Sequence, residues 1–262
     1  MIPVMKPFFG PEEGAAAAEA VASGWVAQGP RVAEFETAVA AKVGARHGVA
    51  VSSCTTGLHL ALVVLGIGPG DEVVVPSLSF IATANVVRYM GATPVFADVD
   101  LLTGNLTAAS VAEAVTPRTR AVILVHQGGL PADVRSVRGE CDARGIALVE
   151  DAACAIGAYL GSEPVGSHSD LVVFSFHPRK VITTGEGGMV MTGRDDWANR
   201  LRRLREHGMS VSAAERHAST APVIERYLEV GFSKFVVRPI ATPTSWRAEL
   251  EALADKVLVL QG

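Results

Sequence analysis

The sequence has little of what would mark several specialised classes of protein. It contains only three cysteines (Cys54, Cys141 and Cys154), an odd number without the spacing of a metal site. We therefore expect reduced thiols, a cytoplasmic protein and no bound metal. The formal net charge is only −4, which gives no sign of a nucleic-acid or membrane-surface partner.

Long apolar runs are also lacking. The longest stretch without Asp, Glu, Lys or Arg extends from His47 to Gly70, and histidines, hydroxyl residues and a Gly-Pro-Gly end interrupt it. The ~20 mainly apolar residues of a membrane-spanning helix are therefore not found. The first residues, Met-Ile-Pro-Val-Met-Lys-Pro, lack a basic region followed by an apolar one, so we expect no signal peptide.

What the sequence does contain is an alternation of helix and strand patterns in a chain that is 49% hydrophobic. Helical patterns cover residues 12–23, 31–43, 56–65, 80–90, 108–115, 134–144 and 197–207. Strand patterns cover residues 47–52, 72–76, 93–97, 121–125, 146–150, 170–176 and 188–192. Apolar strands bracketed by helices predict an α/β fold whose mostly parallel sheet is flanked by helices. Ligands of such sheets bind beyond the carboxyl ends of the strands.

The first loop that follows a predicted strand has the sequence SSCTTG at residues 52–57. It leads into a helix, whose free backbone N–H groups and dipole favour an anion. The hydroxyls of Thr55 and Thr56 would add to such a site. A plain helix cap is the alternative, and this segment alone favours it, because Ser and Thr are common at that position.

The second loop follows the strand that ends near Glu150 and Asp151. A carboxylate at the end of a buried strand is costly unless it meets a positive partner. Strand alternation turns only one of the two toward the site. We choose Asp151, which comes last and is followed by the small Ala152 and Ala153. A helix cap or a structural ion pair is the alternative.

The third loop contains Lys180, within FSFHPRKVITTGEGGM at residues 174–189. A lysine that loses its proton can form a Schiff base with a carbonyl cofactor. Ser175, five residues upstream, can offer a hydroxyl to a phosphate. Most lysines lie at the surface, which is the alternative here. An aspartate, a lysine and hydroxyl residues after separate strands nevertheless match the ring nitrogen, aldehyde and phosphate of pyridoxal phosphate.

Several motifs resemble those of the DegT/StrS-type sugar aminotransferases. The resemblance runs in order from Ile2 to about Gly231. It is carried by SGWVAQGP at 23–30, SSCTTGLHLAL at 52–62, GDEVVVPS at 70–77, FIATAN at 80–85, EDAA at 150–153, SFHPRK at 175–180, TGEGG at 184–188 and LREHG at 204–208. It implies an aspartate-aminotransferase-like, fold-type I enzyme that uses pyridoxal 5'-phosphate.

The resemblance also implies roles for individual residues. By that likeness Lys180 forms the Schiff base with the cofactor and later shuttles protons. Asp151 pairs with the ring nitrogen, and Phe80 stacks on the ring. The phosphate would be held by Thr55, Thr56 and Ser175. Some relatives have histidine in place of the lysine and act as dehydratases, which Lys180 argues against.

Two features depart from the family pattern. Cys154 stands where the family usually has glutamine or histidine to contact the ring hydroxyl of the cofactor, and a thiol is a weak donor. Residues 233–262 match nothing in the family's C-terminal domain. We therefore predict a cofactor-binding large domain at 1–231 and a divergent tail at 232–262 with one helix, from Ala248 to Leu260. The family's small domain would be absent or vestigial.

Together these features predict an aminotransferase that moves an amino group from glutamate or glutamine to a nucleotide-linked keto-sugar, in antibiotic or polysaccharide biosynthesis. A keto-cyclitol or an aminobenzoate precursor is an alternative substrate. An inactive, truncated homologue that binds a partner is a further alternative. The resemblance implies a homodimer. His126 follows a strand and is expected to line the cleft, with a packed or loop-capping histidine as the alternative.

Overall fold

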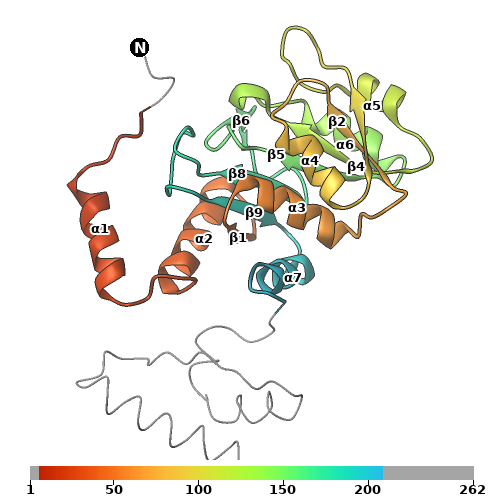
Figure 1. Ribbon diagram of the computed structural model, residues 1–262. Coiled ribbons are helices and arrows are strands. Elements are labelled where there is room, and N and C mark those ends of the chain that lie inside the picture. Colours follow the sequence, from red (N-terminus) through yellow and green to blue (C-terminus); the bar gives the residue numbers. More distant parts are fainter. Residues whose placement is uncertain (1–5, 209–262) are drawn as a thin grey trace, which may run out of the picture. The chain divides into compact units, whose positions relative to one another are not determined.

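The computed structural model describes residues 6–208 of the chain, and Figure 1 shows their arrangement. These residues belong to one compact unit, Met1–Gly208. The predicted tail at 232–262 and its helix from Ala248 to Leu260 lie outside the described residues. None of the helices between residues 6 and 208 is long and apolar enough to cross a membrane.

A seven-stranded sheet forms the centre of this unit. Its order is β1-β9-β8-β5-β4-β2-β3. The five neighbouring strands β8, β5, β4, β2 and β3 pair in parallel, while β9 pairs antiparallel with both β8 and β1. The predicted mostly parallel sheet is thus confirmed. The bounds are β1 His47–Val51, β2 Glu72–Pro76, β3 Thr93–Ala97, β4 Thr119–Val125, β5 Ala147–Asp151, β8 Leu171–Ser175 and β9 Gly188–Thr192.

Helices cover both faces of the sheet. The helices are α1 Pro11–Ala22, α2 Pro30–Val43, α3 Cys54–Leu65, α4 Ala82–Tyr89, α5 Ala108–Ala114, α6 Val134–Asp142 and α7 Asp195–Arg205. Side chains of α3, α4 and α7 share one apolar cluster with Val149 of β5 and Val173 of β8. The residue before each of these points the other way, so Leu148 packs with α5 and α6 and Val172 packs with α2.

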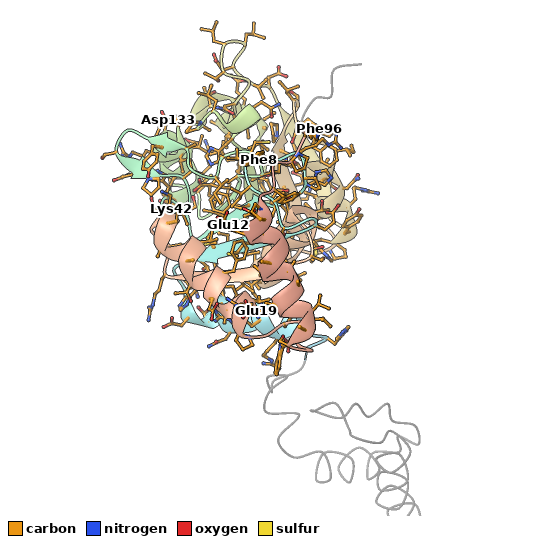
Figure 2. All side chains as sticks on the ribbon, turned by 90° about the vertical axis from the view of Figure 1, so that its left-hand side faces the viewer. Phe8, Glu12, Glu19, Lys42, Phe96 and Asp133 are labelled. Atoms are coloured by element: carbon orange, nitrogen blue, oxygen red, sulfur yellow. The ribbon has the colours of Figure 1, made fainter. Side chains whose placement is uncertain are left out.

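Helix α1 differs from the others because none of its residues is buried. An ion pair joins it to the start of α2, with Arg31 Nη2 2.9 Å from Glu19 Oε1. Figure 2 shows Glu12 and Glu19 on α1, with α2 and Lys42 beside it. Both partners of this ion pair are exposed, so it adds little stability.

The predicted helices and strands are present, with shifts of a few residues at their ends that matter for the site. Helix α3 begins at Cys54, two residues before its expected start, and Ser53 caps it by accepting a hydrogen bond from the Thr56 N–H at 3.1 Å. Helix α4 begins at Ala82, which leaves Phe80 in the preceding loop. Strand β5 ends with Asp151. The sequence patterns did not predict the two-residue strands β6 (Tyr159–Leu160) and β7 (Glu163–Pro164) or the short 3-10 helix η1 (Gln127–Gly129).

Candidate active site

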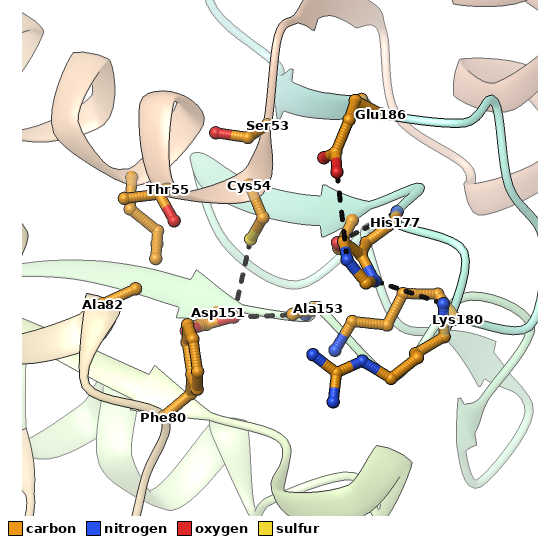
Figure 3. Close-up of a pocket in the computed structure, with 14 residues that line it drawn as sticks. Ser53, Cys54, Thr55, Phe80, Ala82, Asp151, Ala153, His177, Lys180 and Glu186 are labelled. Atoms are coloured by element: carbon orange, nitrogen blue, oxygen red, sulfur yellow. Dashed lines mark hydrogen bonds and ion pairs between the residues drawn. The ribbon is translucent and has the colours of Figure 1, made fainter. Parts of the chain in front are cut away.

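A cavity of about 390 Å³ lies where β5 and β8 end and α3 begins. Figure 3 shows the side chains around it. The residues that line it are Ser53, Cys54, Thr55, Leu58, Phe80, Ala82, Asp151, Ala153, Ser175, His177, Arg179, Lys180, Glu186 and Gly187. All three loops that the sequence pointed to therefore meet at one place, as expected for strands whose carboxyl ends share a sheet edge.

Asp151 is a nearly fully buried carboxylate in this cavity, with 6% of its surface exposed. Its Oδ1 accepts the Ala153 N–H at 3.1 Å, and its Oδ2 accepts the Thr83 hydroxyl at 3.1 Å. Burial raises the pKa of Asp151 above its ordinary value, although these hydrogen bonds and the charge of Lys180 oppose the shift. Within residues 6–208 no cationic side chain forms an ion pair with it, so the cavity presents a buried acid that a cationic ligand would stabilise.

Glu150, the preceding residue, faces away from the cavity. It is fully buried, and its Oε2 lies 2.8 Å from Nε2 of His126. Because His126 Nδ1 accepts the Ala132 N–H at 3.0 Å, its ring proton sits on Nε2 and is donated to Glu150. His126 is 1% exposed and does not line the cavity. The expectation that it lines the cleft is wrong, and the alternative of a packed or loop-capping histidine holds, because its buried ring bonds to Glu150 and to the Ala132 N–H.

Lys180 is carried on the turn that follows β8. Its side chain lines the cavity, and its Nζ lies 3.1 Å from Sγ of Cys154. The turn is held by its own hydrogen bonds: the Lys180 N–H donates to His177 O at 2.8 Å, and the Thr183 hydroxyl donates to Phe176 O at 2.8 Å. Local hydrogen bonds thus fix the backbone from which the lysine extends into the cavity.

The hydroxyl groups gather on the other side, at the N-terminus of α3. Ser53 and Thr55 line the cavity there, and Ser175 reaches it from the end of β8. Thr56, which we also predicted as a phosphate ligand, does not line the cavity. Its hydroxyl is 3.0 Å from Ser52 Oγ and 3.1 Å from Ser53 Oγ, so it supports the loop.

The remaining predicted residues take different positions around the cavity. Phe80 lines it from the loop before α4 and is 75% exposed, so most of its surface is free to contact a ligand. Cys154 contacts Lys180 but is not among the lining residues. Gly188, part of the predicted glycine-rich turn, acts through packing. A Cβ there would lie 2.5 Å from the Cys54 nitrogen, so only glycine lets β9 pass this close to α3.

Several residues in the cavity or directly behind it were not predicted as site residues. Thr83 holds Asp151, and Cys54 places its Sγ 3.8 Å from Asp151 Oδ1. Nε2 of His177 lies 3.8 Å from Oε1 of Glu186, and Arg179 is a second cationic side chain in the cavity besides Lys180. Thr83, Cys54 and His177 fall inside motifs that the sequence singled out. Spacing alone could not show which residues of those motifs turn inward.

The chain is similar in sequence and in structure to known aminotransferases. The model of the DegT/DnrJ/EryC1/StrS aminotransferase family matches residues 8–233. The structure is similar to that of an aminotransferase, TlmJ, from Streptoalloteichus hindustanus, with 45% identity and a TM-score of 0.75 over 78% of this chain and 56% of that one.

Two further solved structures are similar over comparable lengths. One is DesI in the presence of its TDP-sugar product (39% identity, TM-score 0.75, 82% of this chain and 55% of that one). The other is 3-amino-5-hydroxybenzoic acid synthase (37% identity, TM-score 0.74, 78% and 54%). The matches thus span little more than half the length of these relatives. They confirm the expected aminotransferase fold.

Proposed function

The chain belongs to the DegT/DnrJ/EryC1/StrS aminotransferase family, and we propose that its cavity binds pyridoxal 5'-phosphate for transamination. The amino group would pass from glutamate or glutamine to a nucleotide-linked keto-sugar. One observation carries the proposal: a buried carboxylate, Asp151, and a lysine, Lys180, face one cavity at the N-terminus of α3. The likeness to DesI, solved with a TDP-sugar product, supports the substrate class.

The chemistry of the cavity residues fits this cofactor. When bound, pyridoxal phosphate supplies an electron sink for chemistry at the carbon that carries the amino group. Asp151 would pair with the protonated ring nitrogen, which gives its buried charge the partner that it lacks among residues 6–208. The free N–H groups of α3, with the hydroxyls of Thr55 and Ser175, would bind the phosphate. Phe80 would cover one face of the ring.

Lys180 would have two roles. Its Nζ would bond covalently to the aldehyde carbon of the cofactor and so orient the ring. Once displaced by an amino substrate, the same Nζ would accept and return the proton at the reacting carbon. The hydrogen-bonded turn that carries Lys180 would keep its amine close to the reacting atoms in both roles.

Spectroscopy and peptide mapping test the cofactor proposal. Purified protein is titrated with pyridoxal phosphate, its absorbance spectrum is recorded, and the complex is reduced with borohydride and digested with trypsin. We expect the pyridoxyl group on Lys180, in the peptide of residues 180–194. Lys180→Ala should take no label, whereas Lys42→Ala, on the exposed end of α2, should be labelled like the parent. A label on another lysine would reject the assignment.

A second candidate substrate class is an aminobenzoate precursor or a keto-cyclitol. The likeness to 3-amino-5-hydroxybenzoic acid synthase favours it. Incubation of the loaded protein with glutamate and then with each keto substrate, followed by mass spectrometry of the products, separates the two classes. A protein that binds the cofactor but removes the amino group from neither glutamate nor glutamine would instead be a binding subunit.

A further inference from the structure

Cys154 and Lys180 form a thiol–amine pair beside the cavity. Their Sγ and Nζ atoms are 3.1 Å apart, and both side chains are half-buried. The loop of Cys154 is held closely by Gly129, where a Cβ would lie 2.6 Å from the Cys154 carbonyl oxygen. The turn of Lys180 is fixed by the hydrogen bonds described above. Two chemically reactive groups are thus kept within contact distance by separate parts of the backbone.

We propose that this pair is an oxidative modification site, at which a peroxide produces a reversible cross-link between Cys154 and Lys180. The peroxide oxidises the thiol to sulfenic acid, and the peroxide itself is reduced to water. The neutral amine of Lys180 then attacks the sulfur. The new S–N bond replaces the S–O bond, and the hydroxyl leaves with one amine proton as a second water.

The other two described thiols lack this setting. Cys54 faces Asp151, with Sγ 3.8 Å from Oδ1, and burial followed by the charge of Asp151 raises its pKa well above the ordinary value. Burial raises the pKa of Cys141 to about 11, and this residue lies on the buried face of α6 and does not line the cavity. Because the thiolate is the reactive form, both thiols should resist oxidation. No hydrogen bond joins either of them to an amine in residues 6–208.

The cross-link would block the amine that the proposed function requires. This consequence rests on the proposed function, whereas the cross-link itself depends only on the contact between Cys154 and Lys180. Reduction by a dithiol would cleave the S–N bond, return the thiol and the amine, and convert the dithiol to its disulfide. The site would then be switched off by a peroxide and restored by thiols.

The test treats the cofactor-free 262-residue chain with hydrogen peroxide and maps its peptides under non-reducing conditions. Trypsin separates Cys154 from Lys180, since cleavage after Arg144, Arg179 and Arg194 gives residues 145–179 and 180–194. The first peptide contains Cys154 as its only cysteine, and the second contains Lys180 as its only lysine. We expect the two peptides joined, with two hydrogens fewer than their sum, and separated again by dithiothreitol.

Matched variants make the assignment specific. Cys154→Ser should abolish the joined peptide, whereas Cys54→Ser and Cys141→Ser should leave its yield unchanged. The proposal is overturned if Cys154 is oxidised to sulfinic acid while Lys180 stays free, if another lysine is joined, or if Cys54 and Cys154 form a disulfide. Preloading with pyridoxal phosphate should prevent the cross-link. A cross-link that forms equally with the cofactor present supports the modification site and counts against the proposed function.

Discussion

Thr83 donates its hydroxyl proton to Asp151, with Oγ1 and Oδ2 3.1 Å apart, and so ties α4 to the end of β5. Thr83 is 1% exposed, and its hydroxyl is also 2.7 Å from that of Ser79. The carboxylate that we assign to the cofactor ring is therefore oriented from a helix almost seventy residues earlier in the chain.

Replacing Thr83 with valine should remove the hydrogen bond that Oδ2 of Asp151 accepts, and leave those that Oδ1 accepts from Ala153 and Cys54. A buried acceptor would be left unsatisfied, and we expect the free energy of unfolding to fall by roughly 1–3 kcal/mol. Urea denaturation measures this loss. Thr83→Ser keeps the hydroxyl and should retain most of the stability. Equal unfolding curves for Thr83→Val and the parent would show that this hydrogen bond contributes nothing.

Replacing Asp151 with asparagine should stabilise the cofactor-free protein at neutral pH. Burial raises the folded pKa of Asp151, so its favourable contribution is present below the ordinary aspartate pKa and is lost as pH rises through the folded value. Asparagine avoids that loss. We expect a gain on the order of 1 kcal/mol, or about 2–4 °C in Tm, that disappears in acid. Thermal unfolding across pH measures it.

The same variant should lose most transamination, because an amide cannot stabilise a protonated ring nitrogen as a carboxylate does. Glu150→Gln is the matched comparison, since Glu150 is adjacent but faces His126. Glu150→Gln should change the absorbance spectrum of the bound cofactor less than Asp151→Asn does. If Glu150→Gln perturbs that spectrum more than Asp151→Asn does, the wrong carboxylate has been assigned to the ring.

Gly188→Ala should push the start of β9 away from the N-terminus of α3. The new Cβ would lie 2.5 Å from backbone atoms of Cys54 and Ser53, and backbone cannot give way as a side chain can. We expect a loss of about 1–3 kcal/mol in stability and weaker pyridoxal phosphate binding. Gly193→Ala, at the far end of β9, meets nothing within 4 Å and serves as the control. Denaturation and cofactor titration measure both effects.

The homodimer expected from the family resemblance remains a prediction. Large apolar side chains are left uncovered in the described part of the chain, among them Phe8 at 95%, Leu101 at 98% and Leu102 at 95% exposure. A second copy would cover part of this surface. The family resemblance implies that an asparagine of the neighbouring subunit reaches the phosphate, and this sequence has Ser233 at that position. We therefore expect phosphate binding weaker than in relatives that have the asparagine. Light scattering that shows a monomer with tightly held cofactor would contradict both expectations.

The sequence by itself determined most of the architecture. Apolar strand runs, helical spacing and glycine-containing breaks are local signals. The strands of the large sheet and the seven α-helices described between residues 6 and 208 were therefore located within a few residues of their ends. The order of the loops also indicated Asp151 and Lys180, because chemically unusual residues directly after buried strands are few. Strand alternation, a local rule as well, allowed only one of Glu150 and Asp151 to face the site. Asp151 was chosen because it comes last and is followed by the small Ala152 and Ala153.

Only the tertiary structure decided which of these residues meet. Thr83 with Asp151, His126 with Glu150 and Cys154 with Lys180 are pairs separated by 68, 24 and 26 positions in the chain. Their contacts depend on how helices pack on the sheet and where each turn leads, which no local pattern encodes. For the same reason Thr56 turned to support its loop and His126 turned into the interior. Residue type showed what chemistry was available, and packing over long chain distances decided where it could act.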